Sequence, residues 1–145
     1  MNFEKNKQIA KEWHEAFGTD ALKYEYDKYL ADDFTAEFFT GQLINKEQYI
    51  QMDQDLAISF TNSKVTVEEQ IAEGNAVVSV MTWRAVHAAH IKGIAPTYKD
   101  FDIKGIVIDH FKDGKVIKHF PLFDQLLMMK QLGVVKNMVP EPMHV

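Results

Sequence analysis

The chain has 145 residues, of which 46% are hydrophobic and 26% charged, and its formal net charge is −5 at pH 7. This length suits one domain that buries about two-thirds of the surface of its unfolded chain, and the composition is that of a globular protein. Arg84 is the only arginine and cysteine is absent, which excludes a basic nucleic-acid surface, an arginine clamp for phosphates, disulfides and thiolate metal sites.

The N-terminal sequence MNFEKNKQ is charged and lacks the apolar run of a signal peptide. Nowhere do about 18 apolar residues follow one another, as a membrane span requires. We therefore expect a cytoplasmic protein with neither a membrane nor a nucleic acid as its partner.

Helical periodicity marks the N-terminal part of the chain. Apolar residues recur at every fourth position from 9 to 17 and predict an amphipathic helix that ends at Gly18. A second helix is expected over residues 21–30, and the aromatic stretch 32–41 predicts a short strand. His14 is expected to face solvent or a neighbouring helix.

A third helix is expected to begin near Lys46. Asn45 is followed three residues later by Gln48, which resembles a capping box in which each side chain bonds the other residue's backbone N–H.

The hydrophobic period then changes to two, which predicts consecutive antiparallel strands. They cover residues 64–73, 76–91, 99–111 and 115–123 and are separated by turn sequences such as Gly74-Asn75 and Asp113-Gly114. The run 76–91 would span about 50 Å if fully extended, so we expect it to bend strongly around the helices.

A final helix over 125–132 and a tail over 134–145 complete a single domain, residues 1–145. The order ααβαββββα predicts an α+β fold in which a curved sheet wraps around the N-terminal helices.

Several common catalytic signatures are absent. The chain has no GxSxG, GxGxxG, GxxxxGK[ST] or HExxH sequence. His87 and His90 stand three apart on a predicted strand and so point to opposite faces, which argues against a shared metal. We expect no metal and no cofactor, which leaves carboxylates, imidazoles and aromatic rings as the available chemistry.

The hairpin at Asp113-Gly114 determines which of these groups face one another. A two-residue turn places Asp109 with Val107 and Phe111 on the face of Asp124, and His110 faces away. A three-residue loop with a glycine bulge instead gathers His110, Phe120 and Asp124 among apolar residues on one face. We prefer the second register because its apolar face is more coherent, and we expect it to line a pocket for a small apolar molecule.

Asp124 has two interpretations. In an apolar pocket, burial would raise its pKa and make it a candidate general acid/base, with His110 as its partner. As the residue before a helix it is equally a helix cap, which would lower its pKa. His110 also has a structural alternative, a hydrogen-bonded or solvent-edge histidine.

Further residues are candidates for substrate contact. They are Phe120 on the predicted pocket face, Trp83 and His90 on the long strand, and Tyr98 in the turn that follows. Trp83 has the alternative of being an ordinary core residue.

From Thr40 onward the chain resembles the SnoaL-like polyketide cyclase family, within the nuclear-transport-factor-2-like fold. The matching pieces are TGQLINKEQYIQ, VEEQIAEGNAVVSVMTW, HIKGIAPTYK and IVIDHFKDGKVIKHFPLFDQLLMMKQLG. The resemblance implies a cone-like sheet around an apolar pocket and a cofactor-independent aldol cyclisation. It also implies Asp124 as the general acid/base, with a histidine that falls on His110.

The chain departs from this family at Tyr98, which replaces a small residue, and at Phe120, where tryptophan is usual. The resemblance also implies a homodimer formed through the outer sheet face, with Val107, Ile117 and His119 as candidate exposed residues. Three functions therefore stand beside one another: a cyclase- or isomerase-type enzyme, a binder of a small apolar ligand without chemistry, and a structural dimer module.

Overall fold

The computed structural model describes residues 2–135. Most of the expected C-terminal tail, residues 136–145, lies outside the described residues. Within the described part of the chain, no helix has the length and hydropathy needed to cross a membrane.

The first helix, α1 (Phe3–Glu15), begins where Asn2 accepts a hydrogen bond from the Lys5 N–H. Its buried face includes Ala10, Trp13 and His14. His14 was expected at the surface or against another helix, and this was wrong, because α1 lies under the sheet and turns this side chain toward it.

The predicted second helix forms two short pieces, a 3-10 turn η1 (Ala21–Tyr24) and α2 (Tyr26–Tyr29). The predicted strand follows as β1 (Leu30–Glu37), and an additional strand, β2 (Leu43–Asn45), pairs with it in antiparallel orientation.

The third helix, α3 (Lys46–Ser59), has the expected capping box. The Asn45 side chain accepts from the Gln48 N–H, and the Gln48 side chain accepts from the Asn45 N–H, both at 2.9 Å. This local bonding fixes where the helix begins and therefore which residues it turns inward.

The remaining strands match the predicted ones closely. They are β3 (Phe60–Glu73), β4 (Ala76–His87), β5 (Asp100–Lys112) and β6 (Lys115–Phe123), followed by α4 (Gln125–Gln131). The long run expected to reach residue 91 ends as a strand at His87.

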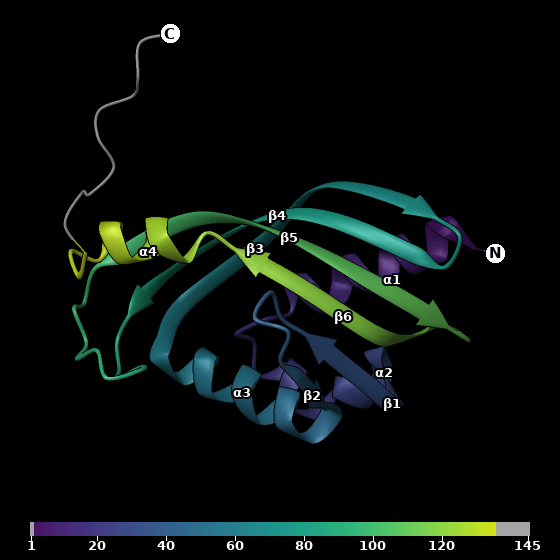
Figure 1. Cartoon of the computed structure of the whole chain (residues 1–145), viewed down its shortest axis with the longest axis horizontal. Helices are drawn as coiled ribbons and strands as arrows, with labels where there is room; N and C mark the ends of the chain where they lie inside the picture. The colour runs from purple at the N-terminus through teal and green to yellow at the C-terminus, as the bar shows by residue number, and fades with distance from the viewer. Residues whose placement is uncertain (1, 136–145) are drawn as a thin grey trace, which may run out of the picture.

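The strands form one curved sheet in the order β2-β1-β6-β5-β4-β3, antiparallel except between β1 and β6. Figure 1 shows the sheet arching over the helices, with α1 beneath it, α3 on the opposite side of the interior and α4 beyond the end of β6. The α+β class with a curved sheet around helices is confirmed.

The core has two neighbouring parts. One is built around Trp13, Phe34 and Tyr49, between α1, β1 and α3. The other is an aromatic cluster around Trp83, with Phe60 and Phe101 edge-on to its ring at centroid distances of 5.2 and 4.9 Å.

The preferred register of the β5–β6 hairpin was wrong. Asp113 and Gly114 have φ angles of 51° and 78°, as in a type I′ turn, so the loop has two residues. A bulge at Ile117 then shifts the pairing, because Phe111 pairs with Val116 while His110 pairs with Lys118.

This register turns Val107, Asp109 and Phe111 inward and leaves Ile106, Ile108 and His110 on the outer face. Val107 and His119, expected as exposed dimer residues, are 1% and 3% exposed. Ile117 is half-buried. The apolar residues Ile106, Ile108 and Phe120, which were the reason for preferring the three-residue loop, therefore lie on the outer surface of the sheet.

Gly105 allows Phe123 to lie across the inner face of β5. A Cβ atom on Gly105 would come within 2.4 Å of two Phe123 ring carbons, closer than any real contact. The Phe123 ring thereby reaches Trp83, with ring centroids 5.7 Å apart.

We expect Gly105→Ala to lower the free energy of unfolding by about 1–3 kcal/mol, because the added methyl group overpacks against the ring. Urea denaturation measures the change. Phe123→Ala removes the obstructing ring, so adding Gly105→Ala to that variant should cost much less. Equal costs in both backgrounds would contradict the steric explanation.

Candidate functional site

A buried carboxylate lies at the centre of the interior. Asp109 on β5 is 0% exposed and contacts two imidazoles. Its Oδ2 is 2.7 Å from His14 Nε2, and its Oδ1 is 2.6 Å from His119 Nδ1. The histidines come from α1 and from the β6 strand beside Asp109, so three elements meet at one side chain.

The charges in this cluster follow from its contacts. Burial alone would raise the pKa of the Asp109 carboxyl, but the charges and hydrogen bonds of His14 and His119 outweigh it and hold that pKa well below its ordinary value. Complete burial lowers the pKa of the His119 imidazole, and the opposing attraction of Asp109 does not restore it.

An ionised carboxylate can only accept hydrogen bonds, so both facing imidazole nitrogens carry hydrogens. His119 therefore donates through Nδ1, and in its neutral form its Nε2 has a free lone pair. Within residues 2–135, Nε2 of His119 forms no hydrogen bond. This is the arrangement of a histidine held by an acid and available as a base.

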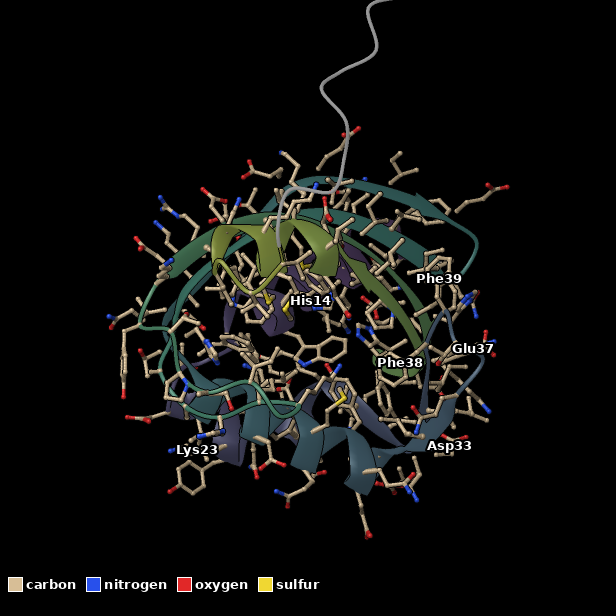
Figure 2. The ribbon with its side chains drawn as sticks, turned by 60° about the vertical axis from the view of Figure 1, so that its left-hand side comes forward. His14, Lys23, Asp33, Glu37, Phe38 and Phe39 are labelled. Atoms are coloured by element: carbon tan, nitrogen blue, oxygen red, sulfur yellow. The ribbon has the colours of Figure 1, made fainter. Side chains whose placement is uncertain are left out.

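Aromatic rings pack around the imidazole of His119. The rings of Trp13 and Tyr49 lie edge-on to it at 4.9 and 5.4 Å, and Phe34 is stacked at 6.3 Å. Figure 2 shows His14 inside the arch of the sheet, whereas Lys23, Asp33 and Glu37 lie at the periphery. The imidazoles are thus held in a buried interior among aromatic rings.

A second polar pair lies on the helix side of the interior. Tyr26 on α2 donates a hydrogen bond of 2.5 Å from its hydroxyl to Asp53 Oδ2 on α3. Burial raises the pKa of Asp53 to about 6, against the opposing hydrogen bond from Tyr26 and the charge of His14. Burial and Asp53 together raise the pKa of Tyr26, so this hydroxyl keeps its proton.

Asp124 lies at the surface as the N-cap of α4. Its Oδ1 accepts a hydrogen bond of 3.0 Å from the Leu127 N–H, and the residue is exposed. The capping contact expected as one of its two interpretations is present. Its action as a general acid/base stays a prediction.

His110 and Phe120 lie on the outer face of the sheet, both half-buried. His110 is opposite Lys118, and Phe120 contacts the exposed Phe39 with ring centroids 4.7 Å apart. The structure therefore does not bring His110 and Asp124 together in an internal pocket.

Of the remaining candidates, only Trp83 lies inside. It is part of the aromatic cluster, and its Nε1 donates to Ser63 Oγ at 3.3 Å. Tyr98 is 72% exposed in the segment after β4, at a φ of 56°. His90 is exposed in the same segment.

An open groove of about 860 Å³ separates α3 from the segment after β4. His90 lines it together with Ile91 and Lys92, opposite Gln51 and Asp55 of α3. None of the cluster residues Asp109, His14 and His119 reaches this groove, so the groove and the buried acid–base groups are separate features of the molecule.

His87 is buried near the same end of the sheet. Its Nδ1 accepts from the Thr97 N–H, so the neutral ring carries its hydrogen on Nε2, which has no partner within residues 2–135. Phe60 lies beside the ring at 5.6 Å.

Asp109, His14, His119 and the Tyr26–Asp53 pair were missed as functional candidates by sequence reasoning. A signal for Asp109 was present, because it alternates with Val107 and Phe111 and so shares their inward face in the two-residue register. Within residues 2–135, no group of three or more His, Cys, Asp and Glu side chains is arranged to hold a metal ion.

Comparison with known proteins identifies the relatives of this domain. The profile described as SnoaL-like polyketide cyclase matches residues 6–132. The comparison with curated protein sequences gave no significant match.

Several solved structures share the fold at low sequence identity. AclR from Streptomyces galilaeus superposes with a TM-score of 0.84 at 19% identity, covering 97% of this chain and 87% of its own. TsrD from Streptomyces laurentii gives 0.81 at 19%, covering 93% and 99%. A SnoaL-like polyketide cyclase from Agrobacterium tumefaciens gives 0.75 at 12%, covering 92% and 100%.

We expect His14→Ala to lower the free energy of unfolding at pH 7 by about 3–5 kcal/mol, because it leaves a buried carboxylate without one of its two donors. His110→Ala, at a half-buried histidine on the outer face, should change it by less than about 0.5 kcal/mol. Urea denaturation measures both. Similar costs for the two variants would show that the buried cluster does not stabilise the fold.

Proposed function

The chain belongs to the SnoaL-like polyketide cyclase family, and we propose that it is a cyclase- or isomerase-type enzyme in which Asp109 and His119 form the acid–base group. Its substrate is a small, mostly apolar molecule with a carbonyl group, polyketide-like in character. The observation that carries this proposal is the hydrogen bond from His119 Nδ1 to the buried carboxylate of Asp109.

The arrangement suits proton transfer next to a carbonyl. The neutral His119 has its Nε2 lone pair free, and Asp109 stabilises the imidazolium that forms when this atom takes a proton. The low-dielectric surroundings of Trp13 and Tyr49 strengthen that stabilisation. Asp124, exposed at the start of α4, is the competing candidate for the same role.

Binding of a small apolar ligand without chemistry is the second candidate function. It is favoured by the burial of the acid–base groups, because His119 is only 3% exposed and does not line the groove beside His90. The surface groove beside His90 offers such a ligand an apolar wall in Met52 and Leu56.

The two functions separate in an exchange experiment. We expect the protein to catalyse exchange of α-hydrogens in a panel of small ketones, 2-tetralone among them, dissolved in deuterium oxide and followed by NMR. His119→Gln should slow the exchange about 10²–10⁴-fold, because the base is lost.

Asp124→Asn serves as the competing variant and should leave the rate unchanged. Loss of exchange in Asp124→Asn with a normal rate in His119→Gln would assign the role to Asp124 instead. If no ketone exchanges but native mass spectrometry shows one retained, the binding function is favoured.

We further propose that the protein is a homodimer formed through the outer face of the sheet. Ile106 and Leu122, paired across β5 and β6, are 48% and 47% exposed, and Ile108 and Phe120 continue the apolar surface beside them. Figure 2 shows Phe39, which contacts Phe120, at the outer edge of the arch. An apolar patch of this kind is typical of an interaction surface.

We expect sedimentation velocity to show a dimer at micromolar concentration. The double variant Ile106→Glu and Leu122→Glu should be a monomer, because each subunit would have to bury two added charges against the same two charges of its partner. Ile58→Glu, at an exposed isoleucine on α3, is the matched control and should remain a dimer. A monomeric unmodified protein would contradict this interface.

A further inference from the structure

We propose that Asp53 is a second catalytic residue, which donates its proton to the carbonyl oxygen of the substrate while His119 removes a proton from the adjacent carbon. Tyr26 is a positioning residue that holds the Asp53 carboxyl by a hydrogen bond. This inference rests on the proposed function of the Asp109–His119 pair and assigns the acid that this base requires.

The position of Asp53 is set by α3. The helix starts at a fixed point because of its capping box. Tyr49 and Asp53 stand four residues apart and are two of its three buried residues. Residues at this spacing lie one above the other on the same helix face. Both side chains therefore point into the interior that the sheet encloses.

The Asp53 carboxyl is held by one oxygen only. Tyr26 donates to Oδ2, and within residues 2–135 no hydrogen bond is made to Oδ1. The residue as a whole is 7% exposed, and no lysine or arginine of the described part of the chain is paired with it. A buried carboxyl with one oxygen fixed and the other free presents its second oxygen to a ligand.

The interior keeps this carboxyl partly protonated. The titratable groups that face it are Tyr26 from α2, Tyr49 from its own helix and His14 from α1. Burial dominates and raises the pKa of Asp53 to about 6. Asp109 is shifted the opposite way by its two histidines, and such a split between two carboxyls separates an acid from a base-orienting group.

Tyr49 lies between the Asp53 carboxyl and the Asp109–His119 pair. Its ring contacts His119 at 5.4 Å, and its hydroxyl, whose pKa is raised well above the ordinary value chiefly by burial, also feels the charges of Asp53 and Asp109. Its position between them puts the acid on the helix side and the base on the sheet side of the same interior. A ketone that enters between these elements would meet both groups.

The chemical step is a keto–enol exchange. His119 Nε2 takes the hydrogen of the carbon next to the carbonyl, and the electron pair of that C–H bond becomes the carbon–carbon double bond. The carbonyl π pair moves to oxygen, which receives the proton of Asp53. The enol, an imidazolium and a carboxylate result, and return of the protons restores both side chains.

The experiment follows the pH dependence of ketone exchange in deuterium oxide, with 2-tetralone as the first probe, between pH 4.5 and 8. In the unmodified protein we expect the rate to fall as pH rises through about 6, where Asp53 loses its proton. Asp53→Asn should lower the rate at pH 5 about 10–100-fold and remove this fall. Asp33→Asn, at an exposed aspartate on β1, should behave as the unmodified protein.

Tyr26→Phe supplies a readout that a purely structural role would not move. The Tyr26 hydrogen bond lowers the pKa of Asp53, so its removal should shift the fall in rate to higher pH. Carbon-13 NMR of the Asp53 carboxyl measures the same titration directly in each variant, whether or not catalysis survives. Thermal unfolding confirms that the variants are folded.

The outcomes are distinct. Exchange that depends on His119 but keeps its rate and pH profile in Asp53→Asn overturns this inference and leaves the proposed function intact. An Asp53 carboxyl that titrates near the ordinary value of about 4 also overturns it. Absence of exchange for every ketone in the unmodified protein removes the proposed function and this inference together.

Discussion

The carboxylate of Asp109 between two imidazoles is the interaction on which the arrangement of this protein depends. A buried ion costs several kcal/mol unless hydrogen bonds compensate it, so Asp109 is tolerable only while His14 and His119 face it. One donor comes from the neighbouring strand, and the other comes from α1. Docking of the first helix under the sheet is therefore specified by a polar contact as well as by the apolar residues Ala10 and Trp13.

The bulge at Ile117 makes that contact geometrically available. Beyond it, His119 pairs with Asp109 across β5 and β6, so both side chains leave the same face of the sheet. Without the extra residue the pairing would slip by one, and His119 would point to solvent. The same shift turns Leu122 outward beside Ile106 of β5, so one irregularity in β6 brings His119 to the polar interior and extends the apolar outer surface.

Structural features that depend only on neighbouring residues could be predicted from the sequence. The Asn45 and Gln48 pair marks the start of α3 because it encodes its own hydrogen bonds. Asp113-Gly114 marks the position of a turn, but the preferred three-residue loop was wrong. The bulge was not predictable, because it depends on which pairing of two distant strands buries the better set of side chains. The predicted position of His14 was wrong for the same reason. Its partner Asp109 lies 95 residues away, and no residue close to His14 in the sequence indicates that contact.

The closed interior has a consequence for any ligand. With Asp109 fully buried and His119 at 3% exposure, little of the imidazole is open to a substrate, and full contact with Nε2 requires neighbouring side chains to move. The rings of Trp13, Phe34 and Tyr49 supply that cover, and their displacement costs free energy that ligand burial must offset. The apparent affinity is then reduced by the fraction of molecules that are open. A large, apolar ligand offsets this cost more readily than a small polar one, because it buries more apolar surface on binding and so gains more free energy.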